Sequence, residues 1–219
     1  MSTHDRRYPG ESPAYRAARD RLLAAEVELR RATEAAAELR RALPPGGVVP
    51  VDYAFTGVAE DGSAAAVRLS QLFAPGRDTL AIYSFMFSPE MEAACPACTS
   101  ILDALDGNAQ EIEERVRLAV VASSPLPRIR AYAAERGWRH LRLLSSAGTT
   151  YNRDYFGEKP DGEQQHMVNV FSRRDGELRH FWGSELRFAP DEPGQHNRCA
   201  DIIWPLWNLL DMTPEGRGR

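Results

Sequence analysis

The feature that most constrains this chain is a buried apolar run followed closely by two cysteines. Residues 79–87 read TLAIYSFMF, an almost unbroken apolar segment of strand length, which is typical of a central strand covered on both faces. Beyond Cys95 and Cys98, apolar residues such as Ile101 and Leu105 recur at helical spacing. The two cysteines are therefore predicted to lie where a strand gives way to a helix.

This position favours a reactive sulfur at Cys95. Proline is common at the first helical position because its missing N–H would be unpaired there anyway, so Pro96 predicts that Cys95 is the N-cap. The sulfur would then face free backbone N–H groups and the positive end of the helix dipole, which stabilise a thiolate. We expect Cys95 to attack and Cys98 to resolve the mixed disulfide. The alternative, half of a structural zinc site, needs further ligands, and the chain has no second Cys-x-x-Cys.

Composition narrows the classes of function. The chain has 219 residues with 43% apolar content, enough for one domain and an appendage, and its net charge of −4 gives no indication of nucleic-acid binding. The first 20 residues are charged and lack the apolar core of a signal peptide, and no stretch is long enough to span a membrane. We therefore predict a cytoplasmic protein, in which a disulfide between Cys95 and Cys98 forms only transiently.

A long helix is predicted near the N-terminus. Residues 13–43 carry leucines and alanines, among them Leu22, Leu29 and Ala36, at alternating spacings of three and four, and Pro44 to Gly47 cannot continue the helix. This seam needs a partner, which is either a second copy of the chain, giving a homodimer, or the chain's own domain. The predicted domains are a helical extension, residues 1–47, and a main domain, residues 48–219.

The main domain alternates strand and helix patterns. This order predicts an α/β fold with a central, mostly parallel sheet, flanking helices and a C-terminal antiparallel hairpin around Asp175-Gly176. Asp106-Gly107-Asn108 predicts a break in the helix that follows the cysteines. The polar, aromatic-bearing residues 145–165 are predicted to form a segment that covers the substrate. The further strands are expected at residues 116–122, 138–144, 166–171 and 178–182, with a helix at 126–136.

Several motifs together resemble a known group of bacterial proteins, the thioredoxin-like family catalogued as domain of unknown function 899. The resemblance covers nearly the whole chain and implies a thioredoxin-like fold, similar also to peroxiredoxins in layout, and a dithiol-disulfide oxidoreductase activity of unstated substrate. The motifs are the helix end at residues 40–44, residues 85–90, the Cys95 to Cys98 motif, Gly137-Trp138, Ser145-Ser146 and residues 210–217.

The chain departs from what the resemblance implies at two places. Family members commonly have an aromatic residue where Met91 stands. Thioredoxin-like folds usually place a cis-proline opposite the cysteines, and the matching residues, His166 to Val168, include no proline. The predicted neighbours of Cys95 and Cys98 are Pro96, Glu92, His166 and Met167.

Three functions follow from these residues. The first is a thiol-disulfide oxidoreductase that needs no cofactor, is recycled by a cellular thiol reductant and acts on a disulfide or, through a sulfenic acid, on a peroxide. The second is a copper-binding protein or copper-dependent oxidase using Cys95, Cys98 and His166, since two thiolates and an imidazole suit copper(I). The third is a non-catalytic binding module in which the long helix makes the contact.

The remaining histidines and the third cysteine carry simpler interpretations. His166 can begin a strand and form local hydrogen bonds only. His196 and Cys199 have metal-like spacing, yet they lie in a loop rich in proline, glycine and aspartate far along the chain from Cys95. We expect a structural loop with a free thiol there, and Cys199 is at most a third sulfur at the site.

Overall fold

The chain divides into two compact units. The computed structural model describes residues 4–59 and 61–217. The division falls between Pro44 and Pro45, so that residues 1–44 form one unit and residues 45–219 the other. None of the described helices is both long enough and apolar enough to cross a membrane.

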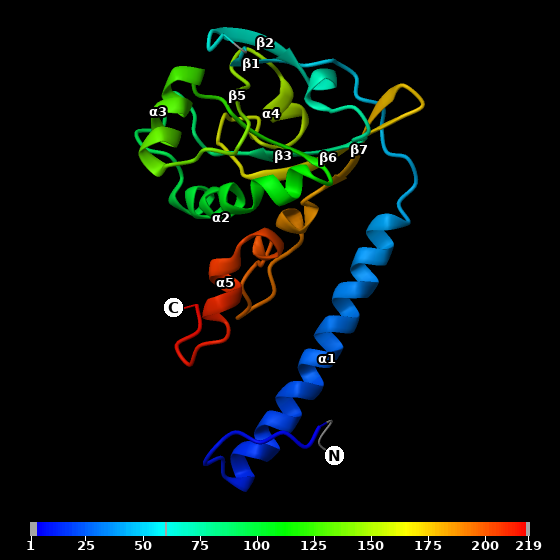
Figure 1. Cartoon of the computed structure of the whole chain (residues 1–219), viewed down its shortest axis with the longest axis vertical. Coiled ribbons are helices and arrows are strands. Elements are labelled where there is room, and N and C mark those ends of the chain that lie inside the picture. Colours follow the sequence, from blue (N-terminus) through cyan, green and yellow to red (C-terminus); the bar gives the residue numbers. More distant parts are fainter. Residues whose placement is uncertain (1–3, 60, 218–219) are drawn as a thin grey trace. The chain divides into compact units, whose positions relative to one another are not determined.

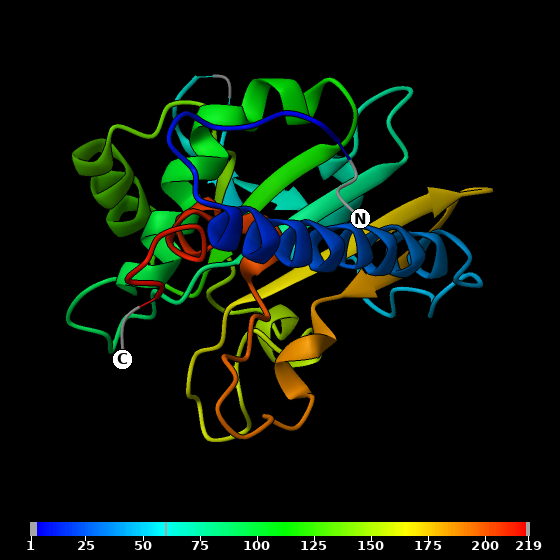
Figure 2. The same cartoon turned by 90° about the horizontal axis from the view of Figure 1, so that it is seen from below.

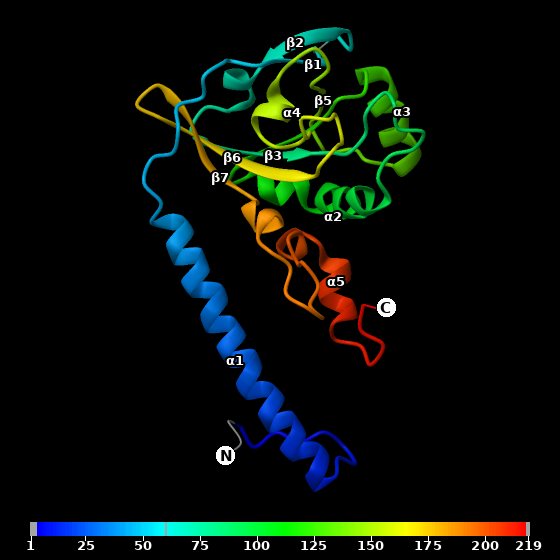
Figure 3. The same cartoon turned by 180° about the vertical axis from the view of Figure 1, so that it is seen from behind.

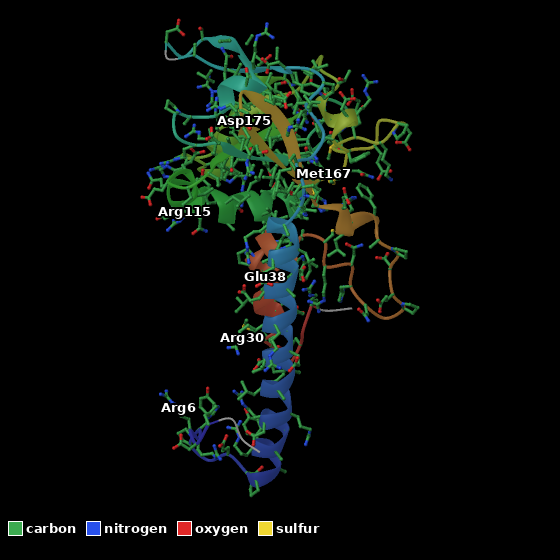
Figure 4. The ribbon with its side chains drawn as sticks, turned by 90° about the vertical axis from the view of Figure 1, so that its right-hand side faces the viewer. Arg6, Arg30, Glu38, Arg115, Met167 and Asp175 are labelled. Atoms are coloured by element: carbon green, nitrogen blue, oxygen red, sulfur yellow. The ribbon has the colours of Figure 1, made fainter. Side chains whose placement is uncertain are left out.

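The first unit consists mainly of the predicted long helix, α1 (Pro13–Arg41). Its N-terminus is capped by Ser12, whose hydroxyl accepts a hydrogen bond from the Tyr15 N–H at 3.2 Å. Figure 4 shows the side chains of Arg30 and Glu38 projecting from this helix. Leu22 and Leu29 of the apolar seam are exposed. The partner that the sequence predicts for this seam stays a prediction.

The second unit is built on one seven-stranded sheet in the order β2-β1-β5-β4-β3-β6-β7 (Figure 1). At its centre β3, β4 and β5 run parallel, and antiparallel pairs complete both edges. This topology confirms the predicted α/β class and the hairpin β6–β7, whose turn holds Asp175 (Figure 4). The sheet is mixed rather than mostly parallel, because among the described strands only the pairs β3–β4 and β4–β5 run parallel. The strands are β1 (Ala54–Val58), β2 (Ala64–Arg68), β3 (Thr79–Ser84), β4 (Arg117–Ala122), β5 (Leu143–Ser145), β6 (Met167–Arg174) and β7 (Glu177–Gly183).

Helices cover both faces of the sheet. Figure 1 and the opposite view in Figure 3 show α2 and α4 on opposite faces. The short helix η2 lies beside the segment that follows α4 (Figure 2). The ring centroids of Phe156 and Phe188 are 5.6 Å apart there. The helices of this unit are η1 (Leu69–Leu72), α2 (Pro96–Glu113), α3 (Leu126–Arg136), α4 (Tyr151–Asp154), η2 (Glu185–Phe188), η3 (Asp201–Ile203) and α5 (Pro205–Leu210).

Both faces of the central strands are buried, which explains their unbroken apolar sequences. In β3, Leu80 and Ile82 join a cluster on the face of α4, whereas Tyr83 joins a cluster on the face of α2. Neighbouring side chains of a strand point to opposite faces, so each face receives every second residue. Cys98 belongs to the cluster on the α2 face and is 1% exposed, so its side chain is buried between α2 and the sheet.

The predicted helix break at residues 106–108 is wrong, and Asp106 accounts for the error. Helix α2 continues through Gly107 to Glu113. The Asp106 carboxylate accepts backbone N–H groups of Arg139 at 3.0 Å and His140 at 2.8 Å, which fixes the helix to the connection between α3 and β5. A helical glycine costs only about 1 kcal/mol, less than the buried face of α2 contributes. The same contacts occupy the N–H groups of the predicted strand 138–144, so β5 begins only at Leu143.

The entry segment of the second unit gives a stability prediction. Gly46 lies against β7, and a Cβ built on it would stand 1.7 Å from the carbonyl oxygen of His180. Gly46→Ala must displace this segment and should lower the free energy of unfolding by about 1–3 kcal/mol. Gly47→Ala is the matched control because its Cβ would meet nothing within 4 Å. Urea denaturation compares them, and equal effects of the two variants would contradict the contact.

Candidate active site

Cys95 lies at the predicted junction of strand and helix. It is the N-cap of α2, and Pro96 is the first helical residue. The Cys95 N–H donates to the carbonyl oxygen of Met86 at 3.1 Å, and the Cys95 sulfur accepts the N–H of Cys98 at 3.3 Å. The connection from β3 therefore returns on itself and fixes the sulfur at the N-terminus of α2.

Arg128 of α3 holds the connection between β3 and α2 in place. Its guanidinium donates to the carbonyl oxygens of Ser88 at 2.8 Å and Met91 at 2.5 Å, and it lies 4.3 Å from the ring centroid of Phe87. The side chain of Glu92, a predicted neighbour of the cysteines, is exposed, while its carbonyl oxygen accepts a hydrogen bond from Arg128 at 3.3 Å. Arg128 thus positions the loop that leads to Cys95.

The two cysteines are free thiols with opposite acid–base properties. The pKa of Cys95 is lowered from 9.0 to about 6, chiefly by a hydrogen bond from the Cys98 thiol and also by the N–H groups of Cys98 and Ala97, while burial opposes the shift. The pKa of Cys98 is raised, first by Cys95 and then by burial. At neutral pH the pair therefore consists of one half-buried thiolate and one buried thiol.

Two further residues act on the cysteines. The Tyr83 hydroxyl is buried beside Cys98, and burial and then Cys98 raise its pKa well above the usual value. The positive charge of Arg187, carried by η2, helps to lower the pKa of Cys95. The sequence analysis missed Arg187, because it lies in no motif and reaches the site only through the hairpin β6–β7 that precedes η2.

His166 lies with Arg187 and Cys199. Nη1 of Arg187 is 3.0 Å from Nδ1 of His166, and the Cys199 sulfur is 3.7 Å from Nε2. Burial, and then Arg187, lower the pKa of His166 to about 4, so the ring is neutral at neutral pH. Cys199 is a free thiol, as expected, and although its loop is far along the chain from Cys95, both cysteines pack against the same apolar cluster.

The three copper ligands predicted from the sequence are Cys95, Cys98 and His166, and they do not form a metal site within the described residues. Among residues 4–59 and 61–217, no group of three or more histidine, cysteine, aspartate or glutamate side chains is placed to hold a metal ion. The ring nitrogens of His166 face a guanidinium and the Cys199 thiol. Met167 (Figure 4), the last predicted neighbour, begins β6 opposite Ser84 and is buried. Its sulfur accepts a hydrogen bond from the Ser184 hydroxyl at 3.6 Å.

A cavity of about 800 Å³ opens beside the loop that leads to Cys95. One wall is formed by Met86 and residues 88–91. The other walls include Ser123, residues 146–149, Asn152 and residues 161–164, which belong mostly to the segment predicted to cover the substrate. The cavity therefore lies next to the cysteine loop and is large enough for a small molecule or a short peptide segment.

Comparisons with known proteins give one family and several structures. The family described as "Bacterial protein of unknown function (DUF899)" matches residues 6–219. No curated protein matches the sequence. Similar solved structures include reduced Prx3 from Vibrio vulnificus (11% identity, TM-score 0.48, covering 70% of this chain and 91% of that chain) and peroxiredoxin Q from Xanthomonas campestris (12%, 0.47, 75% and 96%). Another is Plasmodium yoelii thioredoxin peroxidase I (17%, 0.46, 77% and 91%).

Proposed function

Because this chain belongs to the family of bacterial proteins of unknown function DUF899, whose description names no activity, we propose its function from the site itself: it is a thiol-disulfide oxidoreductase that uses Cys95 and Cys98. One observation carries the proposal. The half-buried Cys95 sulfur accepts the Cys98 N–H at 3.3 Å at the start of α2, its pKa is lowered to about 6, and a buried free thiol lies one turn away.

The reaction proceeds in two exchange steps. The Cys95 thiolate attacks one sulfur of the substrate disulfide, which breaks, and the other sulfur leaves as a thiolate that takes a proton from water. Cys98 then loses its proton and attacks the Cys95 sulfur, releasing the second substrate thiol and leaving a disulfide between Cys95 and Cys98. A cellular thiol reductant supplies the two electrons that restore the pair.

The first step prepares the second. The largest cause of the raised pKa of Cys98 is its interaction with Cys95. When the Cys95 sulfur becomes part of a mixed disulfide, its negative charge is gone, and the N–H groups at the start of α2 no longer have a thiolate to stabilise. Cys98 therefore loses its proton more easily after the first attack than before it.

Arg187 favours a peroxide as a second class of substrate. Its positive charge lies near Cys95 and suits the charge that develops as a peroxide O–O bond breaks. The thiolate would take one oxygen, giving a sulfenic acid and, after protonation, water or an alcohol. The Cys98 thiol then condenses with the sulfenic acid to give the same disulfide and one water molecule.

Single-turnover oxidation tests both substrates. Reduced protein mixed with one equivalent of 2-hydroxyethyl disulfide or hydrogen peroxide, then alkylated, should lose two thiols and show a peptide pair that joins Cys95 to Cys98. Arg187→Met should slow the peroxide reaction at least about tenfold. The exposed Arg139→Met is the control. Failure of both oxidants to join Cys95 and Cys98 would exclude the proposed function, and an unchanged peroxide rate in Arg187→Met would remove Arg187 from it.

A further inference from the structure

The cavity beside the cysteine loop lies at the carboxyl ends of the parallel strands. Ser84, Ala122 and Ser145 end β3, β4 and β5, and the connections that follow supply cavity residues such as Met86, Ser123 and Ser146. The crevice outside the carboxyl ends of such strands is where open α/β sheets bind ligands. Cys95 ends the first of these connections, so the cavity and the reactive sulfur share one edge of the sheet.

Two buried polar side chains in the cavity wall lack partners. Ser146 is 3% exposed and Asn152 is 5% exposed, and both line the cavity. The Ser146 hydroxyl and the Asn152 side-chain oxygen have no hydrogen-bond partner within the part of the chain that the structure describes. Buried polar groups are nearly always paired, so these two indicate a ligand that supplies hydrogen bonds.

The backbone behind Asn152 keeps its side chain against the cavity. A Cβ built on Gly157 would stand 3.3 Å from the Asn152 side-chain carbon and 2.9 Å from the Ser84 hydroxyl. Gly157 therefore allows the chain to pass close behind Asn152, where any larger residue would collide.

The rim of the cavity is negatively charged. Four acidic residues line it, Glu90, Glu158, Asp161 and Glu163, and the described lining includes no lysine, arginine or histidine. Two of the described cations reduce this charge, because Lys159 pairs with Glu163, and Arg128, which donates to the carbonyl oxygens of the cysteine loop, helps to lower the pKa of Glu90. The remaining negative charge favours a cationic ligand and disfavours an anionic one.

We propose that this cavity binds the protonated amine of the substrate reduced at Cys95, with Ser146 and Asn152 pairing its polar groups and the acidic rim selecting its charge. The inference rests on the proposed function for the reaction at Cys95. Met86 connects the two places, because its carbonyl oxygen accepts the Cys95 N–H, its side chain packs against the same apolar cluster as Cys95, and it also lines the cavity. Cys95 and the cavity therefore share Met86 as a neighbour, and in this proposal one amine-bearing disulfide occupies both places.

Three small disulfides of similar size test the selection by charge. Cystamine carries two ammonium groups, 2-hydroxyethyl disulfide is uncharged, and dithiodiglycolate carries two carboxylates. After division by each compound's rate with free dithiothreitol, kcat/KM should be about tenfold higher for cystamine than for 2-hydroxyethyl disulfide, and lowest for dithiodiglycolate. The preference should shrink as salt is raised, because the rim is partly exposed. Equal normalised values for the three compounds would overturn the proposal.

Variants locate the preference in the cavity. Glu158→Gln should lower the ratio of cystamine to 2-hydroxyethyl disulfide about three- to fivefold, as expected for one nearby carboxylate. Glu135→Gln, an exposed position on α3 outside the cavity, should leave the ratio unchanged. Asn152→Leu should weaken cystamine binding at least about fivefold by removing the amide. If Glu135→Gln alters the ratio as strongly as Glu158→Gln, the preference belongs to the net charge of the protein and the cavity proposal fails.

Binding without reaction separates this proposal from the proposed function. In a Cys95→Ser, Cys98→Ser, Cys199→Ser variant no thiol can exchange, so calorimetric titration with cystamine reports the cavity alone. Saturable binding there that Asn152→Leu weakens supports the cavity, even if the native protein turns over no disulfide and the proposed function fails. Turnover by the native protein with no cystamine binding to the variant would leave the function intact and overturn the cavity.

Discussion

Cys95→Ser should lower kcat for disulfide or peroxide reduction by at least about a thousandfold, because it removes the attacking atom of the reaction. Cys98→Ser should leave the first attack intact and stop the reaction at the mixed disulfide. The two variants therefore differ in product as well as rate, since only Cys98→Ser accumulates protein bonded to substrate. Intact-mass spectrometry after mixing with excess 2-hydroxyethyl disulfide detects the trapped adduct on Cys95.

Cys199→Ser is the matched control for this pair of variants. It removes the third thiol, which contacts His166 at 3.7 Å, and should preserve both exchange steps. A mixed disulfide trapped by Cys199→Ser instead of by Cys98→Ser would show that Cys199 performs the resolving step. Full turnover in both Cys95→Ser and Cys98→Ser would show that the dithiol mechanism is wrong.

Local rules were enough to predict the frame that positions Cys95. The unbroken apolar run at residues 79–87 predicted a strand covered on both faces, and Pro96 predicted a helix with Cys95 as its N-cap. Both features are present in the structure. Asp175-Gly176 implied the hairpin that ends the sheet. Each of these depends on residues within a few positions of one another, and for that reason a single sequence reveals them.

Contacts between distant residues could not be predicted in this way. Arg187 and Cys199 reach His166 only because the hairpin β6–β7 and the loop after η2 return to the cysteines. The continuity of α2 through Gly107 depends on Asp106 accepting N–H groups more than 30 positions away. The unpaired side chains of the cavity are likewise a property of packing, since nothing near Asn152 in the sequence marks it as buried.

The reduction potential of the pair should change its pH dependence near pH 6. The pKa of Cys95 is lowered from 9.0 to about 6, whereas that of Cys98 is raised, so the reduced pair holds one proton above pH 6 and two below it. The potential should therefore fall by about 30 mV per pH unit above pH 6 and about 59 mV per unit below it. At pH 7 the thiolate stabilises the reduced form by about 1.4 kcal/mol, which makes the pair about 30 mV more oxidising.

The pH dependence of the folding stability follows from the same lowered pKa of Cys95. A lowered pKa stabilises the folded, reduced protein fully above the unfolded thiol's pKa near 9, and this contribution is lost as the pH falls through about 6. The difference in free energy of unfolding between the reduced protein and Cys95→Ser should thus grow from pH 6 to pH 9. Urea denaturation under dithiothreitol at several pH values measures it.

Equilibration with dithiothreitol redox buffers from pH 5 to pH 8.5, followed by alkylation and mass spectrometry, measures the potential. Two thiols should disappear together, on Cys95 and Cys98, while Cys199 remains alkylated. In Arg187→Met the change of slope should move to higher pH, because the charge of Arg187 helps to lower the pKa of Cys95. A slope of about 59 mV per unit throughout would mean that Cys95 stays protonated, and the thiolate would then no longer explain why this cysteine attacks first.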